Sequence, residues 1–264
     1  MAGQLQIHNI SFSYGERDIF SDLSLEIARG EILCILGANG CGKTTLLQCI
    51  NGTLKPKSGS IILEDTDITT INVMELARKV GTVFQEHSAP FPFSVVEVVR
   101  MGRAPHLSFF ESPSKGDTEI ALNCLNQVGM SHLKDKPYTQ ISGGERQLVL
   151  IARTLAQEPS IILLDEPTSH LDFKNQVLIL KMISKLSSQG LTVIMSTHLP
   201  NQAFLVSSNV ALMNEGRFLA TGYCNDVMTE NNLADTYGME LRIVEIDDTG
   251  KGPATKVCIP VMDS

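Results

Sequence analysis

Gly37-Ala-Asn-Gly-Cys-Gly-Lys43-Thr44-Thr45 is the stretch that decides the fold of this chain. It follows Ile32–Leu36, an apolar run without alternation, which is typical of a strand buried on both faces. It leads into residues 44–50, whose apolar spacing predicts a helix. A strand, a glycine loop and a helix in this order predict the opening unit of an α/β domain.

The same stretch fits the pattern G-x-x-x-x-G-K-[ST] in full, which predicts a phosphate site. Its glycines allow backbone N–H groups to converge on phosphate oxygens, and the start of a helix adds a positive dipole end. We expect Lys43 to reach the β- and γ-phosphates and Thr44 to bind Mg²⁺ through its hydroxyl. A glycine turn that only caps a helix would not need the Lys-Thr pair. The residues expected to bind nucleotide here are Gly37, Asn39, Gly40, Cys41, Gly42, Lys43, Thr44 and Thr45.

A second apolar run, Ile161-Ile-Leu-Leu164, ends in the two acids Asp165 and Glu166. The run predicts a central strand, and the carboxyl ends of such strands are where open α/β sheets place ligands. We expect Asp165 to hold the Mg²⁺ shell and Glu166 to polarise an attacking water. The competing interpretation is that these acids only begin a solvent loop.

The remaining pattern predicts a β-rich start, a helical middle and a polar tail. Apolar residues alternate over 5–14 and 23–27, which predicts paired strands. Residues 94–156 show helical periodicity and read as an insertion into the α/β domain, and a further helix over 173–189 ends at Gly190. The tail from about residue 233 is polar, with a loop expected at 247–252. Further strands are expected at 59–63, 80–84, 192–195 and 210–213.

Composition limits the surroundings in which this chain works. The net charge of −8 over 264 residues argues against a general nucleic-acid binder, and no nucleic-acid partner is expected. No stretch approaches the roughly 20 apolar residues that span a bilayer, and the start has no secretory pattern. The 6 cysteines are scattered without a C-x-x-C pair, which favours a reducing compartment. We therefore expect a cytoplasmic protein whose membrane association comes through a partner.

Ser142-Gly-Gly144 at a predicted helix start offers a second anion site. In its context, Ile141-Ser-Gly-Gly-Glu145-Arg-Gln147, it resembles the Leu-Ser-Gly-Gly-Gln signature of the ABC ATPase family, departing at Ile141 and Glu145. The resemblance implies an α/β fold: a P-loop NTPase (RecA-like) core with an N-terminal antiparallel β subdomain and an inserted α-helical subdomain. It further implies a single ABC ATPase domain over 1–264. The core with its β subdomain would cover 1–92 and 157–232, the helical signature subdomain 93–156, and a C-terminal extension 233–264.

The resemblance also implies roles for further residues. Gln85 matches a glutamine that touches Mg²⁺ and water and senses the permease, and His198 matches a switch histidine. Tyr14 would stack on adenine, although an aromatic at a strand end is often core. Residues 169–172 resemble a loop that crosses a dimer interface. ATP would be held head-to-tail in a homodimer, between the phosphate loop of one copy and Ser142, Gly143 and Gly144 of the other. The expected catalytic set is Glu166, His198, Gln85 and Lys43, and the expected metal ligands are Thr44, Gln85 and Asp165.

A single cassette without a fused membrane span implies a separate ATPase subunit. It would lie on the inner face of the cell membrane, bound to permease subunits and served indirectly by a substrate-binding protein. Residues 91–106, with Gly102-Arg-Ala-Pro-His106, resemble importers of iron-siderophore, haem and vitamin B12. The plainer interpretation is a proline-punctuated segment that packs on the core. Molybdate or tungstate import fits the same residues, and a non-transport ABC protein acting on a macromolecule remains an alternative. A transport subunit should show an apolar groove near 85–106, and the alternative a basic strip.

Overall fold

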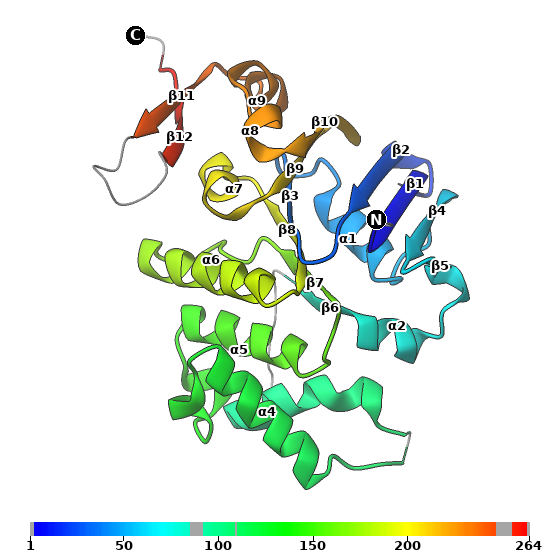
Figure 1. Cartoon of the computed structure of the whole chain (residues 1–264), viewed down its shortest axis with the longest axis vertical. Helices are drawn as coiled ribbons and strands as arrows, with labels where there is room; N and C mark the ends of the chain where they lie inside the picture. Colours follow the sequence, from blue (N-terminus) through cyan, green and yellow to red (C-terminus); the bar gives the residue numbers. More distant parts are fainter. Residues whose placement is uncertain (1–2, 85–91, 109, 247–254, 263–264) are drawn as a thin grey trace.

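The computed structural model describes residues 3–84, 92–108, 110–246 and 255–262, and its centre is a six-stranded sheet (Figure 1). The strand order is β10-β9-β3-β8-β7-β6, parallel except for the antiparallel pair β9 and β10. Strands β3, β7 and β8 are buried along their whole length, as the unbroken apolar runs at 32–36 and 161–164 predict for β3 and β7. The bounds are β3 (Ile32–Leu36), β6 (Val80–Val83), β7 (Ile161–Asp165), β8 (Thr192–Thr197), β9 (Asn209–Asn214) and β10 (Arg217–Tyr223).

A four-stranded antiparallel sheet, in the order β2-β1-β4-β5, forms the N-terminal part of the chain. Its strands are β1 (Leu5–Tyr14), β2 (Arg17–Ile27), β4 (Ser58–Leu63) and β5 (Thr66–Asp67). The alternating apolar side chains of β1 enter the core, and Leu5 lies opposite both Ile27 and Leu63. Gly15, with a φ of 59°, makes the tight turn before β2. Strand β2 therefore begins six residues before the predicted Leu23, because this turn is shorter than the polar stretch suggested.

Helices fill the chain between β6 and β7, as predicted for the insertion (lower part of Figure 1). The described residues 92–108 and 110–156 form no strand, although Ser94 and Pro137 share an isolated bridge. Ser–acid capping boxes start α3 and α4. The α-helices of this region are α3 (Val95–Arg100), α4 (Lys115–Gln127) and α5 (Gly143–Leu155), with the 3-10 helix η2 (Met101–His106) after α3, whereas α2 (Val73–Lys79) precedes β6. The α/β fold with an antiparallel part and a helical part is confirmed, and the subdomain boundaries remain a prediction.

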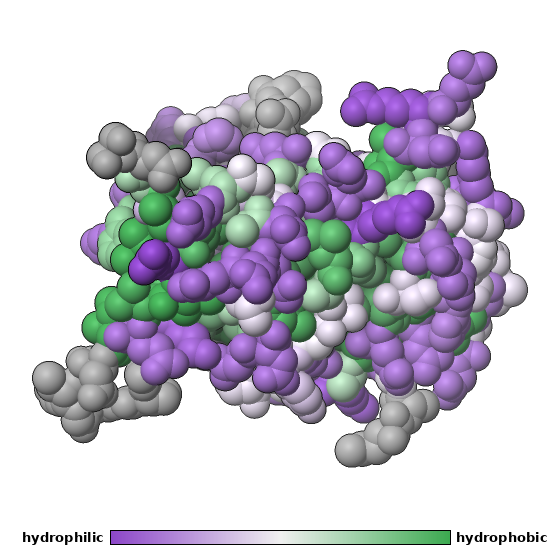
Figure 2. Space-filling view, turned by 90° about the horizontal axis from the view of Figure 1, so that it is seen from above, coloured by the Kyte–Doolittle hydropathy of each residue, from purple (hydrophilic) through white to green (hydrophobic). Residues whose placement is uncertain are grey.

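The C-terminal part differs from the polar tail that we expected. After α8 (Cys224–Val227) and α9 (Glu230–Tyr237), strands β11 (Leu241–Ile246) and β12 (Thr255–Pro260) pair as an antiparallel hairpin. Val244, Ile246 and Ile259 lie on its outer face and are exposed. Figure 2 shows one face of the molecule, on which hydrophobic patches are interspersed among hydrophilic residues. The predicted loop 247–252 lies outside the described residues.

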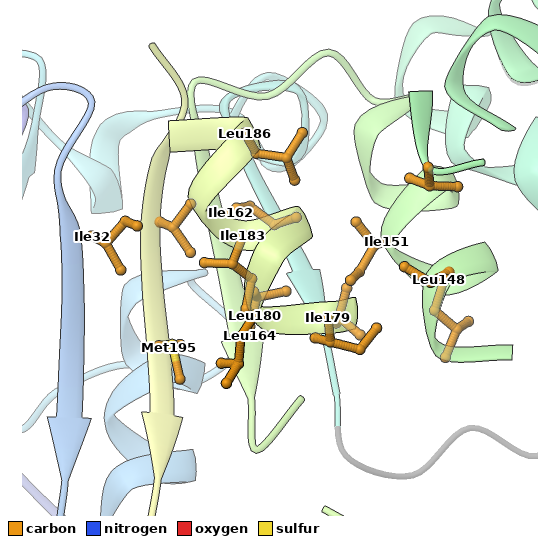
Figure 3. Close-up of a cluster of buried hydrophobic side chains, with 14 of the residues drawn as sticks. Ile32, Leu148, Ile151, Ile162, Leu164, Ile179, Leu180, Ile183, Leu186 and Met195 are labelled. Carbon is orange, nitrogen blue, oxygen red and sulfur yellow. The ribbon is translucent and has the colours of Figure 1, made fainter. Parts of the chain in front are cut away.

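Two apolar cores lie on opposite faces of the six-stranded sheet. One joins the antiparallel sheet to α1 (Lys43–Ile50) and to the near face of β3. The other lies beneath α6 (Phe173–Ser188) and α5, and Figure 3 shows Ile183 and Leu180 of α6 above Leu164 of β7. All six cysteines are buried free thiols. Within the described residues, no helix has the length and apolar character needed to cross a bilayer.

Candidate active site

The phosphate loop connects β3 to α1 at the carboxyl end of the sheet. Gly40 and Gly42 have φ values of 82° and 111°, in the left-handed region that side chains rarely adopt. A Cβ on Gly37 would collide with the backbone carbonyl oxygen of Met213, so this position admits only glycine. Cys41 is buried, and burial raises the pKa of its thiol, which keeps a negative charge out of the loop. Of the other predicted residues, Asn39 and Thr44 are exposed and Thr45 is half-buried. The loop has the backbone that a phosphate cradle needs.

Lys43 lies inside this loop with 5 % of its surface exposed. Its ammonium donates hydrogen bonds to the carbonyl oxygens of Gly37 at 2.8 Å and Ala38 at 3.0 Å. It also lies 3.6 Å from Glu166 Oε1. The positive charge is therefore held between the loop and the carboxyl end of β7, where it can meet phosphate oxygens.

Asp165, the last residue of β7, is buried and receives two hydroxyl donors. Thr44 Oγ1 donates to Oδ2 at 2.8 Å, and Ser196 Oγ donates to Oδ1 at 2.6 Å. The same Ser196 hydroxyl accepts a hydrogen bond from the Glu166 backbone N–H at 2.9 Å. Ser196 was not predicted, and the available signal was a polar residue at the buried end of β8, in register with Asp165. The bonds fix β7 and β8 against the phosphate loop.

The Glu166 carboxylate lies between two nitrogen groups. His198 Nδ1 is 3.1 Å from Oε2, on the side opposite to the contact of Oε1 with Lys43. Glu166 has a φ of 45°, a left-handed conformation that costs free energy in a residue with a side chain and that clusters at functional sites. The His198 side chain is 36 % exposed, whereas that of Glu166 is 11 % exposed. A carboxylate in this setting can orient or activate a water that reaches it from the open side.

The residues with hydroxyl and carboxylate oxygens fit a magnesium ion. Thr44 and Asp165 supply the hard oxygen ligands that Mg²⁺ prefers, and Mg²⁺ usually completes its shell with phosphates and water rather than with a protein cage. Among the described residues, no group of three or more His, Cys, Asp and Glu could hold a metal ion. Gln85, the third predicted ligand, lies outside the described residues.

Ser142, Gly143 and Gly144 lie at the start of α5, in the helical part of the molecule and away from α1 (Figure 1). Across the described residues, no hydrogen bond or ion pair joins them to the phosphate loop. Ser142 and Gly143 are exposed, whereas a Cβ on Gly144 would collide with Asn175. Glu145 completes a capping box with Ser142, and these hydrogen bonds hold the pKa of its carboxyl below the usual value. Glu145, which replaces the glutamine of the signature, therefore stabilises the start of α5.

Tyr14 is 51 % exposed at the end of β1 and meets Phe12 edge-on, with ring centroids 4.9 Å apart. Its ring is therefore not part of the core, contrary to the plainer interpretation. The stacking of Tyr14 on adenine stays a prediction.

A cleft of about 620 Å³ opens between α2, β6 and α5, next to Phe84. Its apolar lining includes Leu54, Ile71 and Leu76, and the exposed Phe84 stands at its edge. Lys55 and Arg153 also line it, so the cleft is mixed rather than purely apolar. None of residues 92–106 lines it, and residues 85–91 lie outside the described residues, so the groove expected near 85–106 stays a prediction.

Comparison with known proteins identifies the family. The family model described as ABC transporter matches residues 20–169. The ferric enterobactin transport ATP-binding protein FepC of Escherichia coli K12 is 34 % identical over 259 residues, covering 98 % of this chain and 94 % of that protein. The molybdate import ATP-binding protein MolC of Haemophilus influenzae is 37 % identical over 239 residues, covering 90 % and 89 %.

Two solved structures agree with these relatives. One, described as a metal-chelate type ABC transporter in an inward-facing conformation, matches with a TM-score of 0.88 at 33 % identity and covers 98 % of each chain. The other is a dimeric ATP-binding cassette bound to ADP and Pi in a post-hydrolysis state. It matches with a TM-score of 0.71 at 28 % identity and covers 83 % of this chain and 98 % of that one. The chain therefore belongs to the ABC transporter family, as an ATP-binding protein that resembles those of iron-siderophore importers.

Proposed function

We propose that this chain is the ATP-hydrolysing subunit of an ABC importer that takes up a metal chelate of the iron-siderophore type through a separate membrane permease. The observation that carries the proposal is the Glu166 carboxylate, held between Lys43 and His198 beside the phosphate loop. The similarity to FepC and to the metal-chelate transporter supports the choice of cargo class.

In this proposal the loop binds the phosphates of ATP through backbone N–H groups and Lys43. The Lys43 ammonium is already largely desolvated, and it would exchange its carbonyl and carboxylate contacts for phosphate oxygens when ATP binds. Mg²⁺ bound by Thr44 and Asp165 would neutralise charge on the phosphates. Because Ser196 and Thr44 hold both Asp165 oxygens, the metal ligand is fixed in direction before the metal binds.

Glu166 then orients or activates the attacking water, and His198 fixes the direction of the carboxylate. The contact between Nδ1 and Oε2 leaves the other carboxylate oxygen beside Lys43, so the water-activating group faces the phosphate-binding loop. Positioning and electrostatic stabilisation of this kind provide most of the catalysis in phosphoryl transfer.

A complete site needs two copies of the chain. Ser142 and Gly143 are exposed and lie apart from the phosphate loop of their own chain, which leaves them available to a second subunit. In a head-to-tail pair they would close over ATP bound to the partner's loop, so ATP would favour the closed state. The dimeric form of the related cassette bound to ADP and Pi supports this arrangement.

Permease docking is proposed at the cleft beside Phe84. The segment Gly102–His106 packs against residues that line this cleft. A Cβ on Gly102 would collide with the Arg153 carbonyl, and His106 Nε2 lies 2.9 Å from the Gln157 carbonyl oxygen. Arg78 Nε donates to the Pro105 carbonyl at 2.8 Å. The segment would therefore support the docking region through its contacts with the same chain. Phe84, 40 % exposed, is the group that a permease helix would cover.

The proposal is tested by uptake in a host strain that lacks the gene for this chain. Cells would be supplied separately with a labelled ferric siderophore, haem and molybdate, with the wild-type chain, Lys43→Ala or Phe84→Asp restored. We expect uptake of the ferric siderophore to be restored by the wild-type chain and by neither variant. The isolated Phe84→Asp subunit should nevertheless hydrolyse ATP at a normal rate. Loss of molybdate uptake alone would favour the function named for MolC. Normal uptake of all three without the chain would contradict an importer role and favour a non-transport ABC protein.

A further inference from the structure

His198 lies in the short segment between β8 and α7 (Pro200–Val206). The C-terminal part of the chain is hydrogen-bonded to this segment. Tyr237, the last residue of α9, donates a hydrogen bond from its hydroxyl to the backbone carbonyl of His198 at 3.0 Å. Burial raises the pKa of the Tyr237 hydroxyl above its usual value, so at neutral pH it is a protonated donor. A residue 39 positions away in sequence thus fixes the main chain of the switch histidine.

The hairpin makes a second attachment to the same segment. Asn201 Nδ2 donates to the Cys258 carbonyl at 3.3 Å, and the Cys258 N–H donates to Asn201 Oδ1 at 2.7 Å. One side-chain amide therefore satisfies both backbone groups of a β12 residue. The N–H of Ile243 in β11 donates to Glu230 Oε1 of α9 at 2.8 Å. Helix α9 and the hairpin are in this way joined to each other and to α7.

The inner side of the segment is tied to the loop that follows Glu166. Gln202 Oε1 accepts hydrogen bonds from Thr168 Oγ1 at 2.8 Å and from Thr197 Oγ1 at 3.0 Å. The Leu199 N–H donates to Thr197 Oγ1 at 3.1 Å. Gln202 is buried, so this bridge is protected from water. Thr197, which directly precedes His198, is therefore held by the buried Gln202, while Tyr237 hydrogen-bonds to the carbonyl of His198 itself.

We propose that Tyr237 is a positioning residue for His198, and that the C-terminal extension thereby contributes to the geometry of the hydrolytic site. The inference rests on the proposed function for its kinetic consequence, although the structural link does not. The direction of the His198 carbonyl fixes the backbone from which the imidazole reaches the Glu166 carboxylate. A misplacement of about 1 Å by a residue far from the chemistry can cost on the order of 10²-fold in rate.

The test is Tyr237→Phe, which removes one oxygen and keeps the ring. We expect kcat for ATP hydrolysis by the full chain to fall about 5- to 30-fold, with KM for ATP changed less than about twofold, because the Tyr237 hydroxyl donates its hydrogen bond to His198 and, among the described residues, forms none with the phosphate loop. The matched control is Tyr223→Phe, at a tyrosine that is 70 % exposed, and it should leave both constants unchanged.

A second readout does not depend on turnover. The imidazole ¹⁵N and ¹H signals of His198, assigned by their loss in His198→Gln, should shift in Tyr237→Phe and stay in place in Tyr223→Phe. A parental kcat in Tyr237→Phe would overturn the inference. So would unmoved His198 signals alongside a lowered unfolding midpoint, because that pattern indicates a purely structural hydroxyl. If the wild-type chain hydrolyses no ATP, the proposed function fails, and the imidazole signals alone then decide the inference.

Discussion

Arg103 lies in η2 with 6 % of its surface exposed and makes three charge-assisted or polar bonds. Its Nε donates to Asp117 Oδ1 at 3.0 Å, and its Nη1 donates to the Ala156 carbonyl and to Glu158 Oε2, each at 2.7 Å. The guanidinium therefore joins η2, α4 and the turn before β7. Arg103→Ala therefore tests most sharply whether the Gly102–His106 motif stabilises the fold.

The cost of Arg103→Ala follows from what the substitution leaves behind. Asp117, whose side chain is 11 % exposed, would lose its cationic partner, and the Ala156 carbonyl would lose its donor. Removing one partner of a buried pair costs about 3–5 kcal/mol. Two hydrogen bonds from Ser114 still reach Asp117, so we expect the lower end, about 3 kcal/mol. That is a large part of the stability of an ordinary domain.

Urea unfolding at pH 7 measures the effect, with the slope of free energy against urea expected to stay constant. Glu158→Gln is the matched control, because the Glu158 side chain is 60 % exposed and its contact with Arg103 should be worth less than about 1 kcal/mol. If Arg103→Ala cost no more than Glu158→Gln, the buried pair would not be what holds this segment, and the reasoning would be refuted.

Two further predictions follow from buried hydrogen bonds. Ser196→Ala should cost about 1–3 kcal/mol in urea unfolding and lower kcat, since it strips a donor from Asp165 and an acceptor from the Glu166 N–H; an unfolding cost below about 0.5 kcal/mol would contradict it. Hydrogen bonds from the side chain and backbone of Ser114, followed by Arg103, lower the pKa of Asp117 to about 2. Its stabilisation is thus present above the unfolded pKa of about 3.9 and is lost as pH falls toward 2. Asp117→Asn should therefore be less stable than the wild type at pH 6, by a margin that narrows at pH 3, and a constant margin would argue against the carboxylate.

Residues with a strong local pattern were predictable from the sequence. The loop Gly37–Thr45 is specified by glycines that few other residues could replace, and Asp165 by its place after an unbroken apolar run. The strand over 32–36 and the helix beginning at Phe173 were predicted at their observed starts for the same reason. In each case the information lies within about ten neighbouring residues.

Contacts made by tertiary packing were not predictable in this way. Ser196 is an unremarkable serine until β8 pairs with β7 and brings it beside Asp165. The hairpin β11–β12 was missed because its apolar residues lie on both faces, as Ile243 and the exposed Val244 show, and so do not alternate with the period of a sheet that has one buried face. The link from Tyr237 to His198 depends on the packing of α9, which no local pattern encodes.

The motif Gly102–His106 resembles a segment of metal-chelate importers, but its contacts lie within the chain. Its residues look like a transport signature, yet Gly102, Arg103 and Pro105 are buried, and the side chains of Arg103 and His106 bind backbone or carboxylate groups of the same chain. A motif shared among relatives can therefore record how a docking segment is supported rather than what is carried. That is why the cargo class is tested by uptake and not inferred from this stretch.

The central claim is that one chain holds half of each site and that ATP joins two of them. The most direct measurement is the solution mass of Glu166→Gln, which retains the shape of the side chain and lacks the carboxylate, with ATP and Mg²⁺ and again with ADP. The account predicts about twice the chain mass of 28.8 kDa with ATP, the single-chain mass with ADP, and no ATP-induced dimer when Lys43→Ala is added. A single-chain mass for Glu166→Gln with bound ATP, or hydrolysis at the parental rate, would contradict it.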